Sequence, residues 1–526
     1  MSDAAITAPP PRRAGVLVPL FSCPSSASWG IGDIGDIEPA TAWLAAAGLR
    51  VLQLLPINEM APGQQSPYSA ISAMAIDPIF IRLPGMPDFE ALGGEAALGP
   101  SDREALESVR RSPRVDHETV RRLKDAALRA SFDRFREAEW CRDSDRARAM
   151  KTFVTEQAWW LEDYSLFRAI HAREHERPWT EWPEALQRRE PPAIDRARRD
   201  LAREVVFYQY LQWIADRQWH DARARAHGVE LFGDLPFMVD TDSADVWARQ
   251  HQFRLDVTIG APPDAFSAEG QDWGTPLYEW EVVAREDFRW LRERARRCAD
   301  LFDGYRIDHL VGFYRTYGRP KDGRPPYFSP SREADQLAQG ERILQVFRAA
   351  GSQIIAEDLG TVPDFVRASL ARLGVPGFKV FRWERHWHTE GQPFREPATY
   401  PPNSVAASGT HDTEPMLVWW DRASDDEKQK VMAVATVQRL AGGVDLRQAP
   451  CATVRDVLLE TLFASGSDLL LLPIQDVFGW KDRINDPSVV AESNWVYRLP
   501  WAIDRPGPDA RARQERLRAW AHMYGR

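Results

Sequence analysis

The chain has 526 residues, 44% of them hydrophobic, a formal net charge of -10 and a sequence pI near 5.7. A chain of this length can bury a large core, so we expect either one large barrel with insertions or two to three domains. The acidic balance argues against a nucleic acid or a membrane surface as the main partner. The 21 Trp, 23 Phe and 12 Tyr supply flat faces that suit ligands with apolar C–H faces, sugars among them, although most will be core.

The cysteines and the N-terminus point to a reducing compartment. The four cysteines form no Cys-x-x-Cys pair, which indicates neither a disulfide framework nor a zinc site. Residues 1–14 are rich in Pro and Ala, lack the apolar core of a signal peptide and are predicted to be disordered, and no apolar run approaches the length of a membrane span. We therefore expect a cytoplasmic protein whose catalytic part covers residues 15–526.

The first predicted strands lie at 15–21 and 51–57, with a predicted helix at 37–47 between them. A loop follows in which Pro67 stiffens the backbone around Tyr68. A rigid tyrosine of this kind could form a wall of a binding pocket, and an ordinary packed aromatic is the alternative.

Residues 30–35, Gly-Ile-Gly-Asp-Ile-Gly, have the glycine spacing of a dinucleotide-binding loop, between a predicted strand and a predicted helix. The pyrophosphate of a dinucleotide must lie at the start of that helix. Asp33 and Asp36 would place negative charge there, so we reject this interpretation.

From about residue 101 to 227 the sequence becomes charged and helix-forming, with few turn signals. Helices are predicted at 116–138, 149–171 and 204–227. This is too much helix for one crossover between strands. We predict that residues 85–200 form an inserted, mainly helical subdomain.

Six further apolar runs follow, which gives eight in all, and helical patterns lie between most of them. Eight strand-then-helix units predict a (β/α)8 TIM barrel with helical insertions. A doubly wound sheet is the alternative, but polar residues at so many strand ends fit a barrel mouth better. The six further strands are predicted at 229–237, 301–309, 353–359, 377–383, 404–412 and 468–476, and the helices at 341–350, 363–373, 425–440 and 454–464.

Three of the predicted strands end in acids, Asp308, Glu357 and Asp412. Strand tips of a barrel converge on one face, so these carboxylates should approach one another and raise one another's pKa. One acid could then stay protonated while another is ionised, which glycosidic cleavage with retention requires. Arg306 and Asp308, two apart on one strand face, should form a charge pair, for which a purely structural ion pair is the alternative. A metal site is disfavoured because Arg306 and His411 would compete with a cation, so we expect no metal and no cofactor.

Several longer motifs together resemble the 4-α-glucanotransferases, or amylomaltases, of the α-amylase clan. The resemblance runs from about residue 15 to 499. The combination of the Pro-Pro-Asp and Gly-Gln-Asp-Trp-Gly segments is specific to this branch. The motifs are Ser66-Pro-Tyr-Ser-Ala, Gly233-Asp-Leu-Pro, Ala261-Pro-Pro-Asp-Ala-Phe-Ser, Gly270-Gln-Asp-Trp-Gly-Thr-Pro-Leu-Tyr, Arg306-Ile-Asp-His, Ala356-Glu-Asp-Leu-Gly, Gly409-Thr-His-Asp, and Arg483-Ile-Asn-Asp-Pro with Asn494-Trp.

The resemblance implies roles for these residues. Asp308 would be the nucleophile, Glu357 the general acid/base and Asp412 the transition-state stabiliser. Gln271 and Trp273 would lie on a substrate-covering loop region at 255–285. Four more residues would contact substrate, namely Tyr68, Asp234, Arg306 and His411. The family commonly has Asn-Asp and Asn where this chain has Thr413-Glu414 and Thr275, differences that bear on substrate preference.

The implied reaction moves a segment of an α-1,4-glucan to the 4-hydroxyl of an acceptor by a retaining double displacement. Maltooligosaccharides and α-1,4-glucans would be both donors and acceptors, and no obligate protein partner is indicated. Two other classes stay open. One is an α-glucan hydrolase that uses the same acids. The other is a catalytically inactive glucan-binding protein, against which the three intact acids argue.

Overall fold

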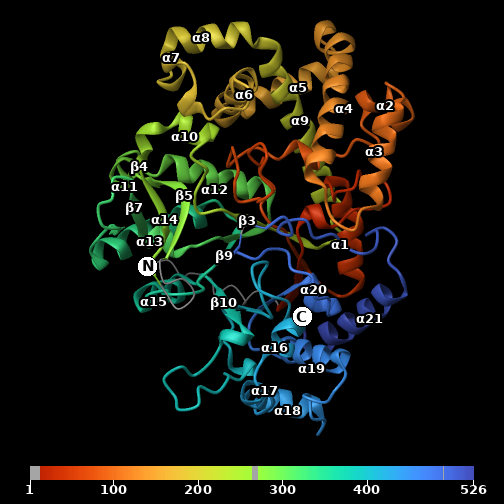
Figure 1. Ribbon diagram of the computed structural model, residues 1–526, viewed down its shortest axis with the longest axis vertical. Helices are drawn as coiled ribbons and strands as arrows, with labels where there is room; N and C mark the ends of the chain where they lie inside the picture. The colour runs from red at the N-terminus through yellow and green to blue at the C-terminus, as the bar shows by residue number, and fades with distance from the viewer. Residues whose placement is uncertain (1–11, 264–269, 490) are drawn as a thin grey trace, which may run out of the picture.

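The computed structural model describes residues 12–263, 270–489 and 491–526. Its centre is a closed barrel of eight parallel strands in the order β1-β12-β11-β10-β9-β6-β3-β2. Figure 1 labels β3, β9 and β10 of this barrel near the middle of the molecule. The predicted (β/α)8 barrel is confirmed, because each of the eight predicted runs supplies one barrel strand. These strands are β1 (Arg13–Leu17), β2 (Val51–Gln53), β3 (Glu230–Leu235), β6 (Gly304–Ile307), β9 (Gln353–Ala356), β10 (Gly377–Val380), β11 (Ser404–Ala407) and β12 (Leu469–Pro473).

Apolar side chains fill the inside of the barrel. They alternate along the strands with residues that pack outward against the helices, as expected when a parallel sheet is covered on both faces. The barrel is therefore a packed core and not a pore, so a substrate must bind at one of its ends. The inner cluster consists of Val51, Phe232, Ile355, Phe378, Val380, Val405, Ala407, Leu469 and Leu471.

The first strand begins earlier than the sequence predicts. Arg13 already pairs with Leu469 of β12, and its guanidinium contacts Glu230 and donates to Oε1 of Gln353 at 2.6 Å. The prediction of disorder through residue 14 was therefore wrong for its last residues, because a charged residue at the start of a strand is not recognised as part of an apolar run. Residues 1–11 of that predicted segment lie outside the described residues.

Between β2 and β3 the chain forms a series of helices, most of which lie together at the top of Figure 1. The helix predicted at 149–171 is in fact two helices that meet at Gln157. That these helices form a subdomain of their own stays a prediction. They are α2 (Pro87–Glu90), α3 (Pro100–Arg111), α4 (His117–Ala138), α5 (Asp145–Glu156), α6 (Ala158–Arg173), α7 (Glu184–Gln187), α8 (Pro191–Asp200) and α9 (Ala202–Ala224).

A second, antiparallel sheet lies beside the barrel, with the order β5-β4-β7-β8. The prediction of a loop region at 255–285 was wrong in this respect, because most of that region forms two strands and a short helix. Its Gly and Pro residues and the register shifts near Thr258 break the alternation by which strands are recognised. Residues 264–269, which include part of the Pro-Pro-Asp motif, lie outside the described residues. The elements are β4 (Phe253–Ala261), β5 (Gln271–Tyr278), α11 (Trp280–Arg285), β7 (Thr316–Pro320) and β8 (Tyr327–Ser329).

The remaining helices surround the barrel, and the last one packs beside the first. Gln514 of α21 donates to the carbonyl of Trp43 in α1 at 2.9 Å. In the part of the chain that the structure describes, no helix is long and apolar enough to span a membrane. The helices are α1 (Ile37–Ala46), α10 (Ala244–Ala248), α12 (Arg289–Leu301), α13 (Val311–Tyr314), α14 (Glu333–Ala349), α15 (Asp364–Leu373), α16 (Met416–Arg422), α17 (Asp425–Met432), α18 (Ala435–Ala441), α19 (Cys451–Phe463), α20 (Ile474–Phe478) and α21 (Pro508–Met523).

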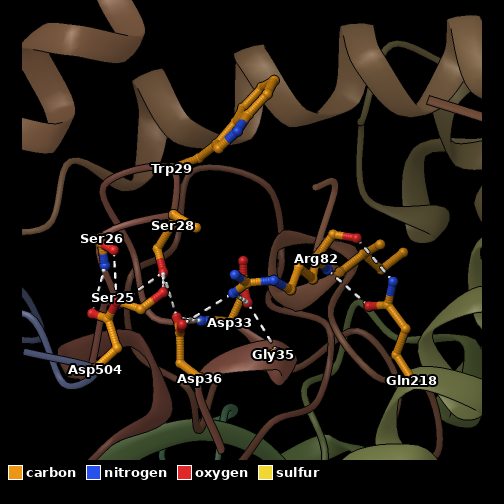
Figure 2. Close-up of polar contacts among 12 residues, drawn as sticks. Ser25, Ser26, Ser28, Trp29, Asp33, Gly35, Asp36, Arg82, Gln218 and Asp504 are labelled. Carbon is orange, nitrogen blue, oxygen red and sulfur yellow. Dashed lines mark hydrogen bonds and ion pairs between the residues drawn. The ribbon is translucent and has the colours of Figure 1, made fainter. Parts of the chain in front are cut away.

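The glycine-rich loop after β1 has a structural role (Figure 2). Asp33 caps the 3-10 turn Ile34–Asp36, and both acids are fully buried. The guanidinium of Arg82 lies 3.2 Å from Asp33 and 3.1 Å from Asp36, and Ser28 donates to Asp36 at 2.6 Å. The carboxylates are thus used within the fold, in agreement with the rejection of a dinucleotide site.

Candidate active site

The three predicted acids come from the C-terminal ends of three barrel strands. Asp308 directly follows β6, Glu357 directly follows β9, and Asp412 lies on the turn after β11. β6 and β9 are neighbours, and β10 separates β9 from β11. The acids therefore share the barrel face where enzymes of this fold carry out their chemistry.

Arg306 links two of the carboxylates at the barrel mouth. Its guanidinium is buried, with Nη2 2.7 Å from Oδ1 of Asp308 and Nη1 2.7 Å from Oδ2 of Asp234, which lies on β3. Burial raises the pKa of Asp234 despite this partner. A cation would have to displace the guanidinium, and among the described residues no group of three His, Cys, Asp or Glu side chains is arranged to hold a metal ion.

Glu357 is held by backbone donors next to Asp308. Its Oε2 accepts from the N–H of His309 at 2.9 Å, and its Oε1 accepts from the N–H of Leu359 at 3.2 Å. Desolvation, together with the charge of Asp308, raises the pKa of Glu357 to about 7, although Arg306 and the two backbone donors oppose this rise. Glu357 can therefore hold a proton near neutral pH, and desolvation contributes more to this than the crowding of acids that the sequence suggests.

Asp412 is the acid that stays ionised. His411 Nε2 lies 3.2 Å from its Oδ2, and Asn485 Nδ2 donates to its Oδ1 at 2.6 Å. Burial alone would raise the pKa of Asp412, but His411 and the hydrogen bond from Asn485 lower it to about 2. The same ion pair raises the pKa of His411 in spite of its burial.

Tyr68 contacts both Asp234 on β3 and His411 on the turn after β11. Its hydroxyl donates to Oδ2 of Asp234 at 2.8 Å and lies 3.1 Å from Nε2 of His411. Its ring stacks on the imidazole of His411, with centroids 5.4 Å apart and planes 18° from parallel. The stiff loop around Pro67 therefore does bring a tyrosine to the wall of the site.

The β4–β5 hairpin brings Trp273 to the residue after Asp308. The indole meets the ring of His309 edge to face at 4.7 Å, and its Nε1 donates to Oε1 of Gln271 at 2.9 Å. Trp273 is 38% exposed and Gln271 is also exposed. The exposed indole of Trp273 can therefore contact a ligand that binds beside Asp308.

Three residues of the site were missing from the sequence prediction. Besides Asn485, Arg483 Nη2 donates to the backbone carbonyl of Asp412 at 2.6 Å, and the ring of Trp495 lies 5.8 Å from that of Tyr68. They belong to the late motifs that carry the resemblance. Their spacing gives no signal that the chain returns to the barrel mouth after its last strand.

Comparisons with known proteins agree with this geometry. A family model described as 4-alpha-glucanotransferase matches residues 18–504. The chain is similar to the 4-alpha-glucanotransferase of Thermus thermophilus, with 33% identity over 531 residues that cover 98% of this chain and 99% of the relative. It is also similar to the 4-alpha-glucanotransferase of Chlamydia pneumoniae, with 32% identity over 499 residues, 93% of this chain and 91% of the relative.

Among solved structures, the chain is similar to the amylomaltase of Streptococcus agalactiae in complex with acarbose. The TM-score is 0.82 at 26% identity, and the match covers 98% of this chain and 99% of that one. The amylomaltase of Corynebacterium glutamicum shares the fold with a TM-score of 0.78 at 22% identity, covering 97% of this chain and 75% of that one. On the family model, the sequence relatives and this shared fold, the chain belongs to the 4-alpha-glucanotransferase family.

Proposed function

We propose that this 4-alpha-glucanotransferase transfers a segment of an α-1,4-glucan to the 4-hydroxyl of an acceptor glucan or glucose by a retaining double displacement. The observation that carries the proposal is the pairing of Glu357, which can hold a proton near pH 7, with Asp308, which Arg306 contacts at 2.7 Å. A proton donor beside a carboxylate nucleophile is what retaining glycosidic cleavage needs.

In the first half-reaction Glu357 protonates the glycosidic oxygen while Asp308 attacks the anomeric carbon. The bond from that carbon to the leaving oxygen breaks, and a β-linked glycosyl ester forms on Asp308. The reducing-end part of the donor leaves with the proton of Glu357. Arg306 keeps a partner when Asp308 becomes a neutral ester, because it also contacts Asp234.

Formation of the ester should lower the pKa of Glu357, so that Glu357 stays ionised and can act as the base of the second half-reaction. The charge of Asp308 is one cause of the raised pKa of Glu357, and ester formation removes that charge. Glu357 then acts as a base and takes the proton of the acceptor 4-hydroxyl, whose oxygen attacks the anomeric carbon while the ester bond from that carbon to Asp308 breaks. The attack restores an α-1,4 linkage and releases the carboxylate of Asp308. The energy of the cleaved bond is held in the ester, so the cycle consumes no cofactor.

The other side chains of the site would bind and shield the sugar. Asp412 would accept hydrogen bonds from sugar hydroxyls in the cleavage subsite, and His411 would donate a hydrogen bond to one of them. Tyr68 and Asp234 lie next to this subsite. Trp273, whose Nε1 donates to Gln271, would cover the intermediate and keep water from it. Transfer then outcompetes hydrolysis because an acceptor sugar is held where water is excluded.

The test is product analysis after incubation of the purified protein with maltotriose alone. We expect glucose and a ladder of longer maltooligosaccharides, with a nearly constant number of reducing ends. A steady rise in reducing ends at the rate of turnover would favour the hydrolase instead. Binding of maltotriose without any turnover would indicate an inactive glucan-binding protein.

A further inference from the structure

The segment after α20 folds back over the barrel mouth as a strap, which we define as residues 483–495, with residue 490 outside the described residues. The N–H of Trp495 donates to the carbonyl of Ile484 at 2.8 Å, so the two ends of the strap are joined. The amide of Asn494 bonds to the backbone of Asp486 and Val489 inside it. The strap is thus a folded element that can place a side chain accurately.

One residue of the strap reaches the carboxylate of Asp412. Asn485 is 7% exposed, its Nδ2 lies 2.6 Å from Oδ1 of Asp412, and its backbone N–H donates to the carbonyl of His411 at 3.2 Å. Arg483 adds a bond to the backbone carbonyl of Asp412 and is itself paired with Asp486 at 2.8 Å. The strap therefore holds both the backbone and the side chain of the His411–Asp412 turn.

The two oxygens of Asp412 are held by different parts of the chain. His411 contacts Oδ2 from the turn itself, and Asn485 contacts Oδ1 from the strap. Two donors on two oxygens fix the plane of a carboxylate. An amide donor brings no charge, so the negative charge of Asp412 remains available to sugar hydroxyls, whereas an arginine in its place would neutralise that charge.

We propose that Asn485 is a positioning residue for the transfer reaction, which acts by fixing the plane of the Asp412 carboxylate. The inference rests on the proposed role of Asp412 in gripping the sugar. Without Asn485 the carboxylate of Asp412 could rotate, which would weaken its contacts in the transition state more than those in the substrate complex. Loss of the Asn485 side chain should therefore lower turnover more than substrate binding.

The test compares Asn485→Leu and Asn485→Asp with the wild type, measuring kcat and KM for maltotriose between pH 5 and pH 8. We expect Asn485→Leu to lower kcat by about 10- to 100-fold at every pH, with KM changed by less than about threefold. Asn485→Asp should lose at least as much at pH 8, where its carboxylate faces Asp412. At lower pH one of the two acids binds a proton and donates it in a hydrogen bond, so the kcat of Asn485→Asp relative to Asn485→Leu should rise at least about tenfold.

The ratio of the two variants cancels every pH effect that both variants share, including the titration of Glu357. The groups that face Asp412 are also the same in both variants, namely His411 on the turn, Tyr68, and the arginines Arg306 and Arg483 on neighbouring elements. Asn494→Leu is the matched control, because Asn494 is 8% exposed in the same strap and bonds only backbone groups there among the described contacts. Its melting temperature should fall like that of Asn485→Leu, but the kcat of Asn494→Asp relative to Asn494→Leu should not rise at lower pH, because the described contacts of Asn494 do not include Asp412.

Wild-type kcat in Asn485→Leu, or a ratio of the two variants that does not change with pH, would overturn the inference. If both variants fail to fold, Asn485→Ser, whose side chain is too short to reach Asp412, must show the same loss of kcat. A wild-type protein that does not disproportionate maltotriose would instead overturn the proposed function. The two failures are thus distinguishable.

Discussion

Desolvation of one side chain, Glu357, sets the proton balance of the site. Because its pKa is raised to about 7, it is protonated below that pH and loses its proton above it. We expect kcat/KM to fall as the pH rises through about 7, which gives the basic limb of a bell-shaped profile. In Glu357→Gln this limb should disappear when the donor is an α-glucosyl fluoride, whose leaving group needs no protonation. Persistence of the limb in that variant would assign the acid to another residue.

Loss of the nucleophile should separate activity from folding. Asp308→Asn removes the group that forms the ester in the proposed mechanism, so turnover should fall by roughly 10⁴- to 10⁶-fold. The fold should tolerate the change, because Arg306 still contacts Asp234 and the side chain of Asp308 is 28% exposed. The measurement is disproportionation of maltotriose beside a thermal melt. Turnover near that of the wild type in a correctly folded variant would contradict the assignment.

Two residues that differ from the usual family pattern have local roles on the turn that carries His411 and Asp412. The hydroxyl of Thr413 lies 3.0 Å from both the N–H and the carbonyl of Thr410, and so closes that turn. Glu414 pairs with Arg422 at 2.7 Å. Thr413 thus stabilises the turn from within, and Glu414 joins it to the end of α16.

At the scale of elements, the β4–β5 hairpin should control the choice between transfer and hydrolysis. Trp273→Ala removes an aromatic face beside His309, so water would reach the glycosyl ester more easily. We expect the release of reducing ends per transfer to rise by roughly 3- to 10-fold. The control is Tyr327→Ala, equally exposed at 38% but on β8 at the opposite edge of the same sheet. Equal effects of both changes would show that Trp273 has no special place over the ester.

A buried charge cluster ties α6 to the loop after β3. His171 is fully buried between Glu176 at 2.6 Å and Asp242 at 3.1 Å, with Arg168 beside it. Burial lowers the pKa of His171, but the two carboxylates raise it overall, above its value in an unfolded chain. A raised histidine pKa stabilises the fold at pH values below about 6.5, and this stabilisation is lost as the pH rises through the folded-state pKa.

His171→Gln should therefore be more destabilising at pH 6 than at pH 9. The measurement is urea unfolding of wild type and variant at both pH values. Glu176, whose pKa His171 and Arg168 lower to about 2 despite burial, stays ionised across this window and does not add to the difference. An equal loss of stability at both pH values would show that His171 is neutral in the fold.

How far the sequence predicts these elements depends on whether their signal is local. The barrel strands are continuous apolar runs such as Leu469–Pro473, so all eight were recognised, and the acids at their tips came with them. The β4–β5 hairpin was missed because Gly274 and Pro276 interrupt its alternation. Asn485 was missed because its contact with Asp412 spans 73 residues and depends on the path of a strap whose described residues form no strand or helix. The raised pKa of Glu357 was predicted, but its main cause was not, since desolvation is a property of the folded chain.

At the scale of the whole molecule, the barrel closes where the first and last strands meet. Five residue pairs from Arg13↔Leu469 to Leu17↔Pro473 join β1 to β12. The final helix α21 packs beside α1 and α19 over this seam, and its Trp520 meets Phe463 of α19 at 5.5 Å. The three proposed catalytic acids follow strands β6, β9 and β11, none of which pairs with β1. The seam therefore offers a place where stability can be changed without touching the chemistry.

Trp520→Ala should weaken the seam and leave the site intact. Trp520 is 2% exposed, and truncation of a buried tryptophan to alanine costs about 3–5 kcal/mol through lost burial and the cavity it leaves. Met523→Ala on the same helix is the matched control, because Met523 is 65% exposed and its loss should change the free energy of unfolding by less than about 0.5 kcal/mol. Unfolding in urea measures the free energy of unfolding, and kcat per folded molecule at 25 °C measures the activity. We expect a large drop in stability with unchanged kcat for Trp520→Ala, because α21 contributes no side chain to the barrel mouth among the described contacts. A comparable fall in kcat would mean that altered packing at the seam changes the position of Asp412, through β12 and the strap that follows it.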